Sequence, residues 1–264
     1  MTKPLIPAQR RDRIQDFLAA NKIARTADLC TLLDASEATV RRDLEWLEQE
    51  GILERTHGGA ILSQHLPLEP GYQQRALTYP EEKRSIGAAA ASLIEKDDIV
   101  FINSGTTTTE VIRHIRGDPS ISIFTNNLSG AFEVGEPAFH YYIVGGEFQP
   151  RSNSLAGRFG IENLGQVFAN KAILGVDGVS LRHGCTVPSN AEAEIMRQMI
   201  KHTRGEVIIV ADHSKWSVVS NFQIAAIAQV NRLVTDPGLD PLAFESLSSQ
   251  GVQILVASTH LVGT

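Results

Sequence analysis

The chain has 264 residues, of which 42% are apolar and 20% are charged, and its formal net charge at pH 7 is -6. This composition excludes a disordered chain, and the length is sufficient for a small domain joined to a larger one. The net acidic charge gives no argument for nucleic-acid binding, so DNA binding would have to come from how the charges are distributed over the surface.

The sequence gives no sign of a membrane segment or a metal site. No apolar run approaches the roughly 18 residues of a membrane helix, and residues 1–15 lack the apolar segment of a signal peptide. We therefore expect a cytoplasmic protein with no membrane partner. The two cysteines, Cys30 and Cys185, are too few for a disulfide framework or a thiolate metal site. The histidines show no metal-ligand spacing, so neither a metal nor another cofactor is predicted.

Three short helices are predicted within the first fifty residues. In the first helix, Ile14, Phe17 and Leu18 repeat at helical spacing. Thr26 is expected to cap the second helix, which ends near Asp34. The third helix follows after a tight break.

This third helix carries two adjacent arginines and is expected to run from an N-cap at Ser36 to a stop at Gly51. Its apolar face consists of Val40, Leu44 and Leu47. At about 100° per residue, the opposite face presents Arg42, and Arg41 lies on a flank. A short helix after a tight turn is typical of one that enters the DNA major groove, where arginine pairs with guanine edges or phosphates. The alternative is a solvated face in which the arginines pair with acidic neighbours, namely Glu37, Glu45 and Glu48.

The residues after Gly51 read ILERTHGGAIL and predict two short strands around a His57-Gly58-Gly59 turn. The helices and this hairpin together resemble the winged helix-turn-helix of DeoR-type (GlpR-like) bacterial transcription regulators of sugar metabolism. The resemblance rests on the stretch SEATVRRDLEWLEQEGILERTHGGA. The residues that we expect at the DNA are Ser36, Glu37, Thr39, Arg41, Arg42, Arg55, His57, Gly58 and Gly59.

A polar, proline-containing stretch, residues 63–79, is predicted to link residues 1–62, the DNA-binding domain, to residues 80–264. The last range alternates helical segments with short β-branched runs, which favours an α/β domain with a mainly parallel sheet covered on both faces. The expected strands lie in DIVFINSG, ISIFTNN, HYYIVGG, KAILGVDG, EVIIVADHS, RLVTD and VQILVA. Ligands of such sheets bind beyond the carboxyl ends of the strands.

These carboxyl ends are polar and rich in glycine. In NSGTTTTE, Gly105 allows the backbone to approach an anion, and the threonines add hydroxyls at a helix N-terminus. Taken alone, this turn could be an ordinary helix cap. The other strands end in Asn126-Asn127, Gly145-Gly146, Asp177-Gly178, and Asp212 followed by Ser214-Lys215. Their convergence predicts a small phosphorylated ligand. No P-loop lysine and no G-x-G-x-x-G motif supports a nucleotide enzyme.

The second half also resembles the sensor domain of the DeoR family, through EEKRSIG, FINSGTTTTEV, YIVGGEFQPRSNSLAG, ILGVDGV, EAEI and VADHSKW. That resemblance implies a fold similar to ribose-5-phosphate isomerase and a sugar-phosphate effector. It places the phosphate at Gly105–Thr108 and the sugar near Asp177, Glu192 and Lys215, while Met196 stands where family members often have lysine. The full predicted effector set is Ser104, Gly105, Thr106, Thr107, Thr108, Asn126, Gly145, Gly146, Asp177, Gly178, Glu192, Asp212 and Lys215.

The function expected from these observations is that of a transcription regulator, acting as a repressor, whose binding to a double-stranded DNA operator is controlled by a phosphorylated sugar. An isomerase-like enzyme is the first alternative, but Val179, Ser180 and Leu181 follow Asp177-Gly178 where the isomerase has further acidic residues. We therefore expect no enzyme. A sensor that acts through protein contacts is the second alternative. One winged helix is too small to specify a genomic site, so a homo-oligomer, a dimer or tetramer, is expected.

Overall fold

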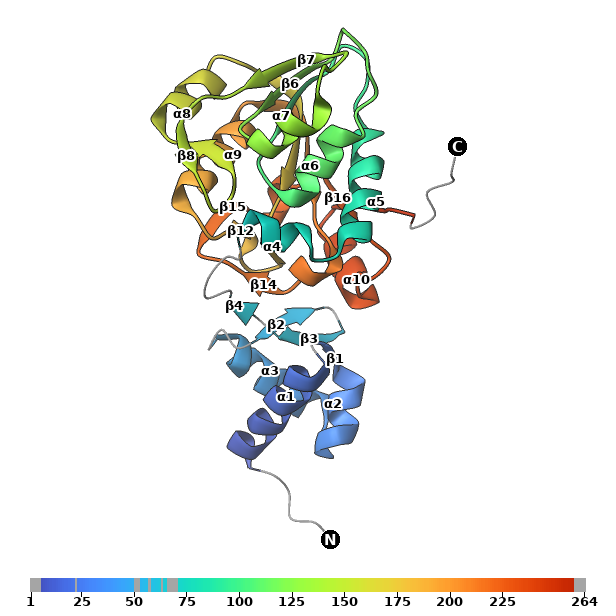
Figure 1. Ribbon diagram of the computed structural model, residues 1–264. Coiled ribbons are helices and arrows are strands. Elements are labelled where there is room, and N and C mark those ends of the chain that lie inside the picture. Colours follow the sequence, from blue (N-terminus) through green and yellow to red (C-terminus); the bar gives the residue numbers. More distant parts are fainter. Residues whose placement is uncertain are drawn as a thin grey trace.

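The computed structural model describes residues 6–21, 23–49, 53–56, 58–62, 64–65 and 71–258. These residues form a small helical domain with a three-stranded sheet and a larger α/β domain (Figure 1). The two domains are joined through a segment that begins after the small sheet and ends at α5 (Pro80–Ala91).

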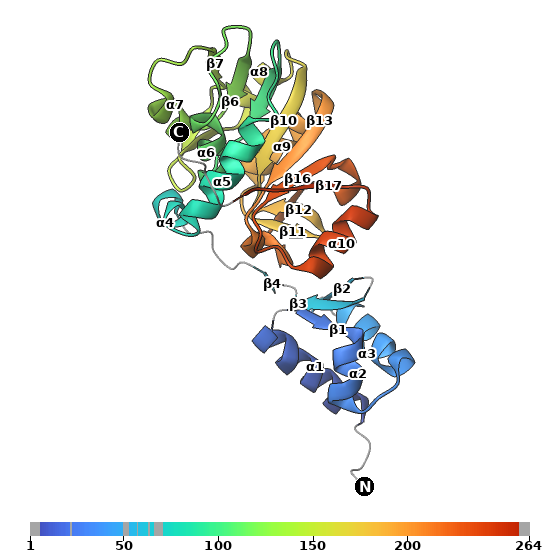
Figure 2. The same cartoon turned by 90° about the vertical axis from the view of Figure 1, so that its right-hand side faces the viewer.

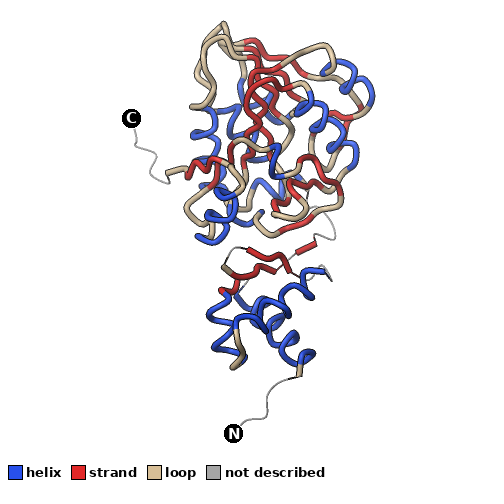
Figure 3. Tube along the Cα trace, turned by 180° about the vertical axis from the view of Figure 1, so that it is seen from behind, coloured by secondary structure: helices blue, strands red, loops and turns tan. Residues whose placement is uncertain are grey.

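The small domain is built as a winged helix. Its elements are α1 (Pro7–Asn21), β1 (Ile23–Arg25), α2 (Thr26–Leu33), α3 (Glu37–Gln49), β2 (Leu53–Thr56) and β3 (Gly59–Leu62). The strands pair antiparallel in the order β1-β3-β2. The three helices meet in a core to which every predicted apolar stripe contributes, including Ile14, Leu18, Leu29, Leu33, Val40, Leu44 and Leu47. In Figure 3 the small sheet lies between these helices and the α/β domain.

Two details of this domain differ from the sequence prediction. Thr26 is the first residue of α2 rather than its cap, and the N-cap Arg25 makes no side-chain capping hydrogen bond. The reason is that Ile23–Arg25 is extended and pairs with β3, a strand too short for the sequence pattern to reveal. Asp34 ends α2 in a left-handed conformation (φ 49°), as expected. Gly51 and His57 lie outside the described residues.

The α/β domain is organised around a parallel sheet of seven strands in the order β17-β16-β13-β10-β5-β6-β7. The strands are β5 (Ile99–Ile102), β6 (Ser122–Thr125), β7 (His140–Ile143), β10 (Ala169–Gly175), β13 (Thr203–Val210), β16 (Arg232–Thr235) and β17 (Gln253–Val256). The predicted parallel sheet is thereby confirmed, because each of the seven predicted apolar runs contributes one strand.

Helices cover both faces of this sheet, as Figure 2 shows for α5 and α10 (Pro241–Ser249). Alternate residues of β5 point to opposite faces: Phe101 belongs to the core on one side, and Val100 and Ile102 to the core on the other. The remaining covering helices are α6 (Thr106–Arg113), α7 (Leu128–Val134), α8 (Arg158–Leu164) and α9 (Asn190–Lys201). Within the described part of the chain, no helix has the length and apolarity that a membrane crossing requires.

Smaller elements complete the α/β domain. An antiparallel sheet is formed by β11 (Gly178–Ser180), β12 (Gly184–Val187) and β15 (Phe222–Ala225), and a hairpin by β8 (Glu147–Gln149) and β9 (Ser154–Ala156). Two 3-10 turns are η1 (His213–Lys215) and η2 (Ile227–Gln229).

The segment predicted as a linker, residues 63–79, contains structure of its own. β4 (Gln64–His65) pairs parallel with β14 (Val218–Val219). The short helix α4 (Tyr72–Ala76) packs on the α/β domain, where the Tyr72 backbone N–H donates to the Arg151 carbonyl at 2.8 Å. The described parts of this polar segment are therefore bound to the α/β domain.

Candidate effector site and DNA-binding face

A cavity of about 140 Å³ lies beyond the carboxyl ends of β5, β10 and β13, at the edge of the sheet where ligands of such folds bind. Residues just after each strand line the cavity: Asn103 and Ser104 after β5, Val176 and Asp177 after β10, and Asp212, two residues after β13. Parallel strands bring these sequence-distant side chains together because all their carboxyl ends point the same way.

Eight of the thirteen predicted effector residues line this cavity. They are Ser104, Gly105, Thr106, Thr107, Asp177, Glu192, Asp212 and Lys215. Met196, where a lysine was expected from the family pattern, also lines it. The cavity therefore combines hydroxyls, carboxylates and a lysine with one apolar wall.

Two other predicted residues support the cavity without lining it. Thr108 is fully buried, and its hydroxyl donates back to the Gly105 carbonyl at 3.1 Å. The Asn126 side chain accepts from the Ser104 backbone N–H at 2.9 Å and donates to the Leu155 carbonyl at 2.9 Å. Both side chains hold the loop at Ser104–Gly105 in shape, because their own polar groups are occupied by backbone partners.

The three predicted glycines Gly145, Gly146 and Gly178 do not line the cavity. A Cβ at Gly146 would lie 2.4 Å from the Ala156 carbonyl oxygen, and one at Gly178 would lie 2.2 Å from that of Val218. Backbone packing therefore excludes a side chain at both positions. The sequence prediction placed these glycines at the ligand. In the structure, Gly146 and Gly178 instead allow close contact between two backbone segments.

The loop before α6 has the chemistry of an anion site. Gly105 is the N-cap of α6 and offers no side-chain capping hydrogen bond, so the first N–H groups of the helix are left for another acceptor. Thr106 and Thr107 in the first turn line the cavity with Ser104. A helix N-terminus with free N–H groups favours an anion through both hydrogen bonds and the helix dipole.

A buried lysine faces this loop. Lys83 is 5% exposed, and its ammonium donates to the carbonyls of Arg75 and Thr78, the latter at 2.6 Å. Burial lowers the pKa of Lys83 to about 8, against the attraction of Asp212. Lys83, Arg75 and Thr78 line the same cavity as the Ser104–Thr107 loop, so the cavity holds a cationic group as well as the N-terminus of α6.

The carboxylates of the cavity differ in their environment. Asp177 accepts from the Arg75 guanidinium at 3.4 Å. Burial raises the pKa of Glu192, while a hydrogen bond from Ser152 opposes that rise. Asp212 accepts from the Ser214 backbone N–H at 3.0 Å and so shapes the η1 turn that carries Lys215. Such a set of acceptors and donors suits the hydroxyls of a polar ligand.

Sequence reasoning missed several residues of the cavity: Arg75, Thr78, Lys83, Asn103 and Val187. Lys83 lies in the EEKRSIG stretch, so the family resemblance was a signal, but no strand end or glycine turn marked it. Arg75 and Thr78 lie in the segment interpreted as a linker. No group of His, Cys, Asp and Glu with the arrangement of a metal site was found in the described parts of the chain.

On the DNA-binding domain, the arginine face of α3 is exposed. Arg41 forms an exposed ion pair with Glu37 at 2.5 Å, as the solvated-face alternative expected. Arg42 is also exposed and has no ion-pair partner in the described part of the chain. At the helix start, the hydroxyls of Ser36 and Thr39 are 2.9 Å apart. The predicted DNA-contacting residues of α3 thus remain accessible.

The predicted wing residues have packing roles. The Arg55 backbone N–H donates to the Glu48 carboxylate at 3.2 Å. Gly59 is buried, and a Cβ there would lie 2.0 Å from the Ala24 carbonyl oxygen, so β1 excludes any side chain. Gly58 faces the α/β domain, since a Cβ at this position would lie 3.6 Å from Leu242 Cδ2.

A winged helix joined to an α/β domain with a polar cavity defines the class of ligand-responsive transcription regulators. Residues 10–65 match the family model described as the DeoR-like helix-turn-helix domain, and residues 78–237 match that of the DeoR C terminal sensor domain. The chain therefore belongs to the DeoR family of DNA-binding transcription regulators, and the resemblance of its motifs is confirmed.

Two relatives span nearly the whole chain. The HTH-type transcriptional repressor GlcR of Bacillus subtilis (strain 168) is 34% identical over 94% of this chain and 95% of its own length. The HTH-type transcriptional regulator GlpR of Haloferax volcanii is 31% identical over 95% of this chain and 98% of its own length.

Among solved structures, the full-length sorbitol operon regulator SorC from Klebsiella pneumoniae matches with a TM-score of 0.41 at 11% identity, over 92% of this chain and 99% of that chain. Ribose 5-phosphate isomerase a from Methanocaldococcus jannaschii matches with a TM-score of 0.36 at 12% identity, over 51% of this chain and 53% of that chain.

Proposed function

We propose that this regulator is a transcriptional repressor whose binding to an operator is controlled by a sugar phosphate held in the cavity. The observation that carries this proposal is the convergence of the Ser104–Thr107 loop with Lys83 and Lys215 at one cavity. A helix N-terminus, hydroxyls and two ammonium groups together match a phosphate ester better than a neutral sugar.

The remaining side chains of the cavity suit the sugar. Asp177 and Arg75 form a donor and acceptor pair that can be shared with ligand hydroxyls, and Glu192 adds a carboxyl group whose pKa is raised by burial. Met196 and Val187 supply an apolar wall for the carbon skeleton. The phosphate then provides affinity, and these groups provide selection among sugars.

Binding without catalysis is the role that this cavity supports best. Isomerase chemistry needs a carboxylate base beside the substrate carbon and a second acidic group near it. Residues Val179 and Ser180 after Asp177-Gly178 are buried in β11, so that segment supplies no further acid, and the other carboxyl groups of the cavity, Glu192 and Asp212, come from other elements. The winged helix gives the cavity a different use, the control of DNA binding.

On the DNA side, we assign Arg41 and Arg42 to phosphates or guanine edges, with Ser36 and Thr39 near the backbone at the start of α3. One winged helix reads too few base pairs for a genomic site, so we infer a homo-oligomer that presents two or more copies to the operator. A cytoplasmic location is part of this proposal, in keeping with two free cysteines.

Thermal denaturation of the whole protein with and without ligands tests the effector assignment. The panel contains hexose and pentose phosphates with their parent sugars, for wild type, Thr107→Ala and Lys215→Ala. Lys201→Ala, an exposed lysine of α9, is the matched control. A ligand at about 100 times its Kd stabilises the folded state by about 2.7 kcal/mol, which raises the melting temperature by roughly 5–10 °C.

The expected result is stabilisation by one phosphate ester that its parent sugar does not give and that both cavity variants weaken. Equal stabilisation by ester and parent sugar would overturn the assignment of the Ser104–Thr107 loop. The alternative, regulation through protein contacts, is tested separately by measuring binding to random duplex DNA at several salt concentrations. Contacts to DNA phosphates make the affinity fall steeply with salt, so a steep fall would support a DNA-binding regulator.

A further inference from the structure

The segment between the wing and the α/β domain is attached to that domain at two places, one of which forms part of the cavity wall. We call its described residues, Gln64–His65 and 71–83, the strap. It contains β4 and α4 and leads from β3 of the winged helix to the first turns of α5. The contacts of α4 and of β4 connect the strap to the α/β domain.

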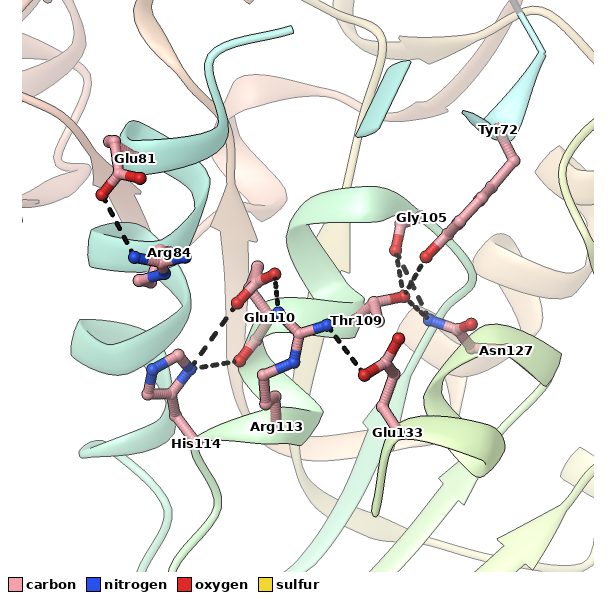
Figure 4. A network of polar contacts seen from close by, with 10 residues as sticks. All are labelled: Tyr72, Glu81, Arg84, Gly105, Thr109, Glu110, Arg113, His114, Asn127 and Glu133. Carbon is pink, nitrogen blue, oxygen red and sulfur yellow. Dashed lines mark hydrogen bonds and ion pairs between the residues drawn. The ribbon is translucent and has the colours of Figure 1, made fainter. Parts of the chain in front are cut away.

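The first attachment joins α4 to the anion-binding loop. The Tyr72 hydroxyl and the Thr109 hydroxyl are 2.9 Å apart, and Thr109 donates to the Gly105 carbonyl at 2.8 Å. The Asn127 amide also donates to the Thr109 hydroxyl, at 3.0 Å. Figure 4 shows Tyr72 reaching this group from the strap. Tyr72 is therefore two hydrogen bonds from the Gly105 carbonyl, although it does not itself line the cavity.

The strap also forms part of the cavity wall. Arg75, Thr78 and Lys83 all line it, and Lys83 donates to the carbonyls of the other two. The Arg75 guanidinium donates to Asp177, which follows β10, at 3.4 Å. A ligand in the cavity would therefore contact the strap directly, and an anion would attract the positive charges of Arg75 and Lys83.

The second attachment is the pairing of β4 with β14. Gln64 pairs with Val218 and His65 with Val219. β14 follows the η1 turn, whose Ser214 and Lys215 line the same cavity. β4 therefore contacts the strand that follows a cavity-lining turn, although Val218 and Val219 do not themselves line the cavity.

Helix α4 depends on these contacts. It has five residues, none of them buried, and a helix of that length is unstable on its own in water. Elements with few buried contacts open at low free-energy cost, so small changes at the cavity can shift α4 between attached and detached arrangements.

Beyond the strap, the wing is docked on the α/β domain. Ile61 of β3 is fully buried within the hydrophobic cluster of that domain, and Arg182 donates to the Glu48 carbonyl at 2.6 Å. An attached strap holds the wing close to this surface, because β4 follows β3 within two residues.

We propose that the strap is the element that reports cavity occupancy to the DNA-binding domain: a phosphate-bearing ligand fastens α4 against the cavity and stabilises the docked wing. This proposal rests on the proposed function, since it takes the cavity to be a phosphate site. A ligand can regulate only by differential interaction with two arrangements, and Arg75, Thr78 and Lys83 supply that difference.

Hydrogen–deuterium exchange of the whole protein tests it, with inorganic phosphate as the probe and sodium chloride at matched ionic strength as the reference. Phosphate is expected to slow exchange both at the loop, residues 104–109, and in α4. Protection of the loop with no change in α4 would overturn the strap proposal and leave the phosphate site intact. Protection of neither segment would overturn both the phosphate site and the strap proposal that depends on it.

The variant Tyr72→Phe isolates the connection. Loss of one neutral hydrogen bond is expected to reduce the phosphate-dependent slowing in α4 about fivefold, while the slowing at the loop changes less than about twofold. Tyr142→Phe, which removes the hydroxyl of an exposed tyrosine in β7, is the matched control and should behave as wild type. Equal slowing of α4 in wild type and Tyr72→Phe would contradict the role assigned to this contact.

Discussion

Lys83 is the residue whose charge is most sensitive to what fills the cavity. Burial lowers its pKa to about 8, so the ammonium is partly lost above that pH in the empty protein. The pKa in the unfolded chain is 10.5, so the unfolded state binds more protons between about pH 8 and 10.5. Burial of Lys83 therefore destabilises the fold at neutral pH, and this penalty fades as the pH rises through that window.

A phosphate beside Lys83 favours the charged form and raises its pKa again. We therefore expect the affinity for the phosphorylated ligand to fall as pH rises above about 8, by at most tenfold per pH unit. The ligand's own second ionisation, near pH 6, lies outside this range. Titration calorimetry between about pH 7 and 9.5 measures the change. Lys83→Met should make the affinity independent of pH in this range. If the affinity of the wild type were already independent of pH, Lys83 would not contact the phosphate.

Arg42 and Asp43 are neighbours in α3 with opposite expected roles. Arg42 is exposed, whereas Asp43 is 1% exposed and accepts from Arg10 at 2.6 Å and from Arg11 at 3.3 Å, which ties α1 to α3. Arg42→Ala should weaken DNA binding and reduce the salt dependence by about one ion, with stability changed by less than about 0.5 kcal/mol. Asp43→Ala should destabilise the domain by about 1–3 kcal/mol. Urea unfolding and DNA titrations measured on both variants distinguish the two roles; unfolding of Arg42→Ala would contradict its exposed position.

At the scale of the elements, the small sheet depends on a glycine. A Cβ at Gly59 would lie 2.0 Å from the Ala24 carbonyl oxygen, so Gly59→Ala must push β3 away from β1. Overpacking of this kind typically costs 1–3 kcal/mol. Gly71→Ala is the matched control, because a Cβ there meets nothing within 4 Å. A denaturant midpoint for Gly59→Ala equal to that of Gly71→Ala would mean that the strands separate without strain.

The elements that could be predicted from sequence are those with a long enough apolar pattern. The seven parallel strands and the three helices of the winged domain were predicted, because β-branched runs and helical spacing recur over several residues. β1 and α4 were missed, since three and five residues carry no period. The cavity was predicted at the strand ends. Arg75 and Lys83 were not predicted, because they lie in α4 and α5 and no local sequence pattern shows that this part of the chain packs at the cavity.

A glycine after a predicted strand was an ambiguous signal for the site. Gly105 and Gly146 both follow predicted strands, and both have positive φ. Only Gly105 faces the cavity, while Gly146 packs on the Ala156 backbone. The sequence prediction could not separate close approach to a ligand from close approach to another strand, because both require the absence of a side chain.

At the scale of the whole molecule, the α/β domain packs against the wing of the small domain, the part that we expect to approach DNA. β2 and β3 lie between the helices of the small domain and the α/β domain (Figures 1 and 3). Gly58 at the wing turn faces Leu242 of α10, and Ile61 is fully buried in the cluster of the α/β domain. Gly58 itself stays exposed, whereas Ile61 is covered, so we expect that a wing inserted into a DNA groove along its strands first leaves α10.

Arg182 allows the effect of this docking on DNA binding to be measured, because it donates to the Glu48 carbonyl of the small domain at 2.6 Å in an exposed hydrogen bond. Arg182→Ala should weaken docking and so increase the fraction of molecules with a free wing, tightening binding to random duplex DNA up to about fivefold. The sign is informative, because removal of a positive charge by itself weakens attraction to DNA. Arg158→Ala removes another exposed arginine, on α8, and should give only this small weakening. If Arg182→Ala weakened DNA binding as Arg158→Ala does, the docked wing would not be the arrangement that opposes DNA.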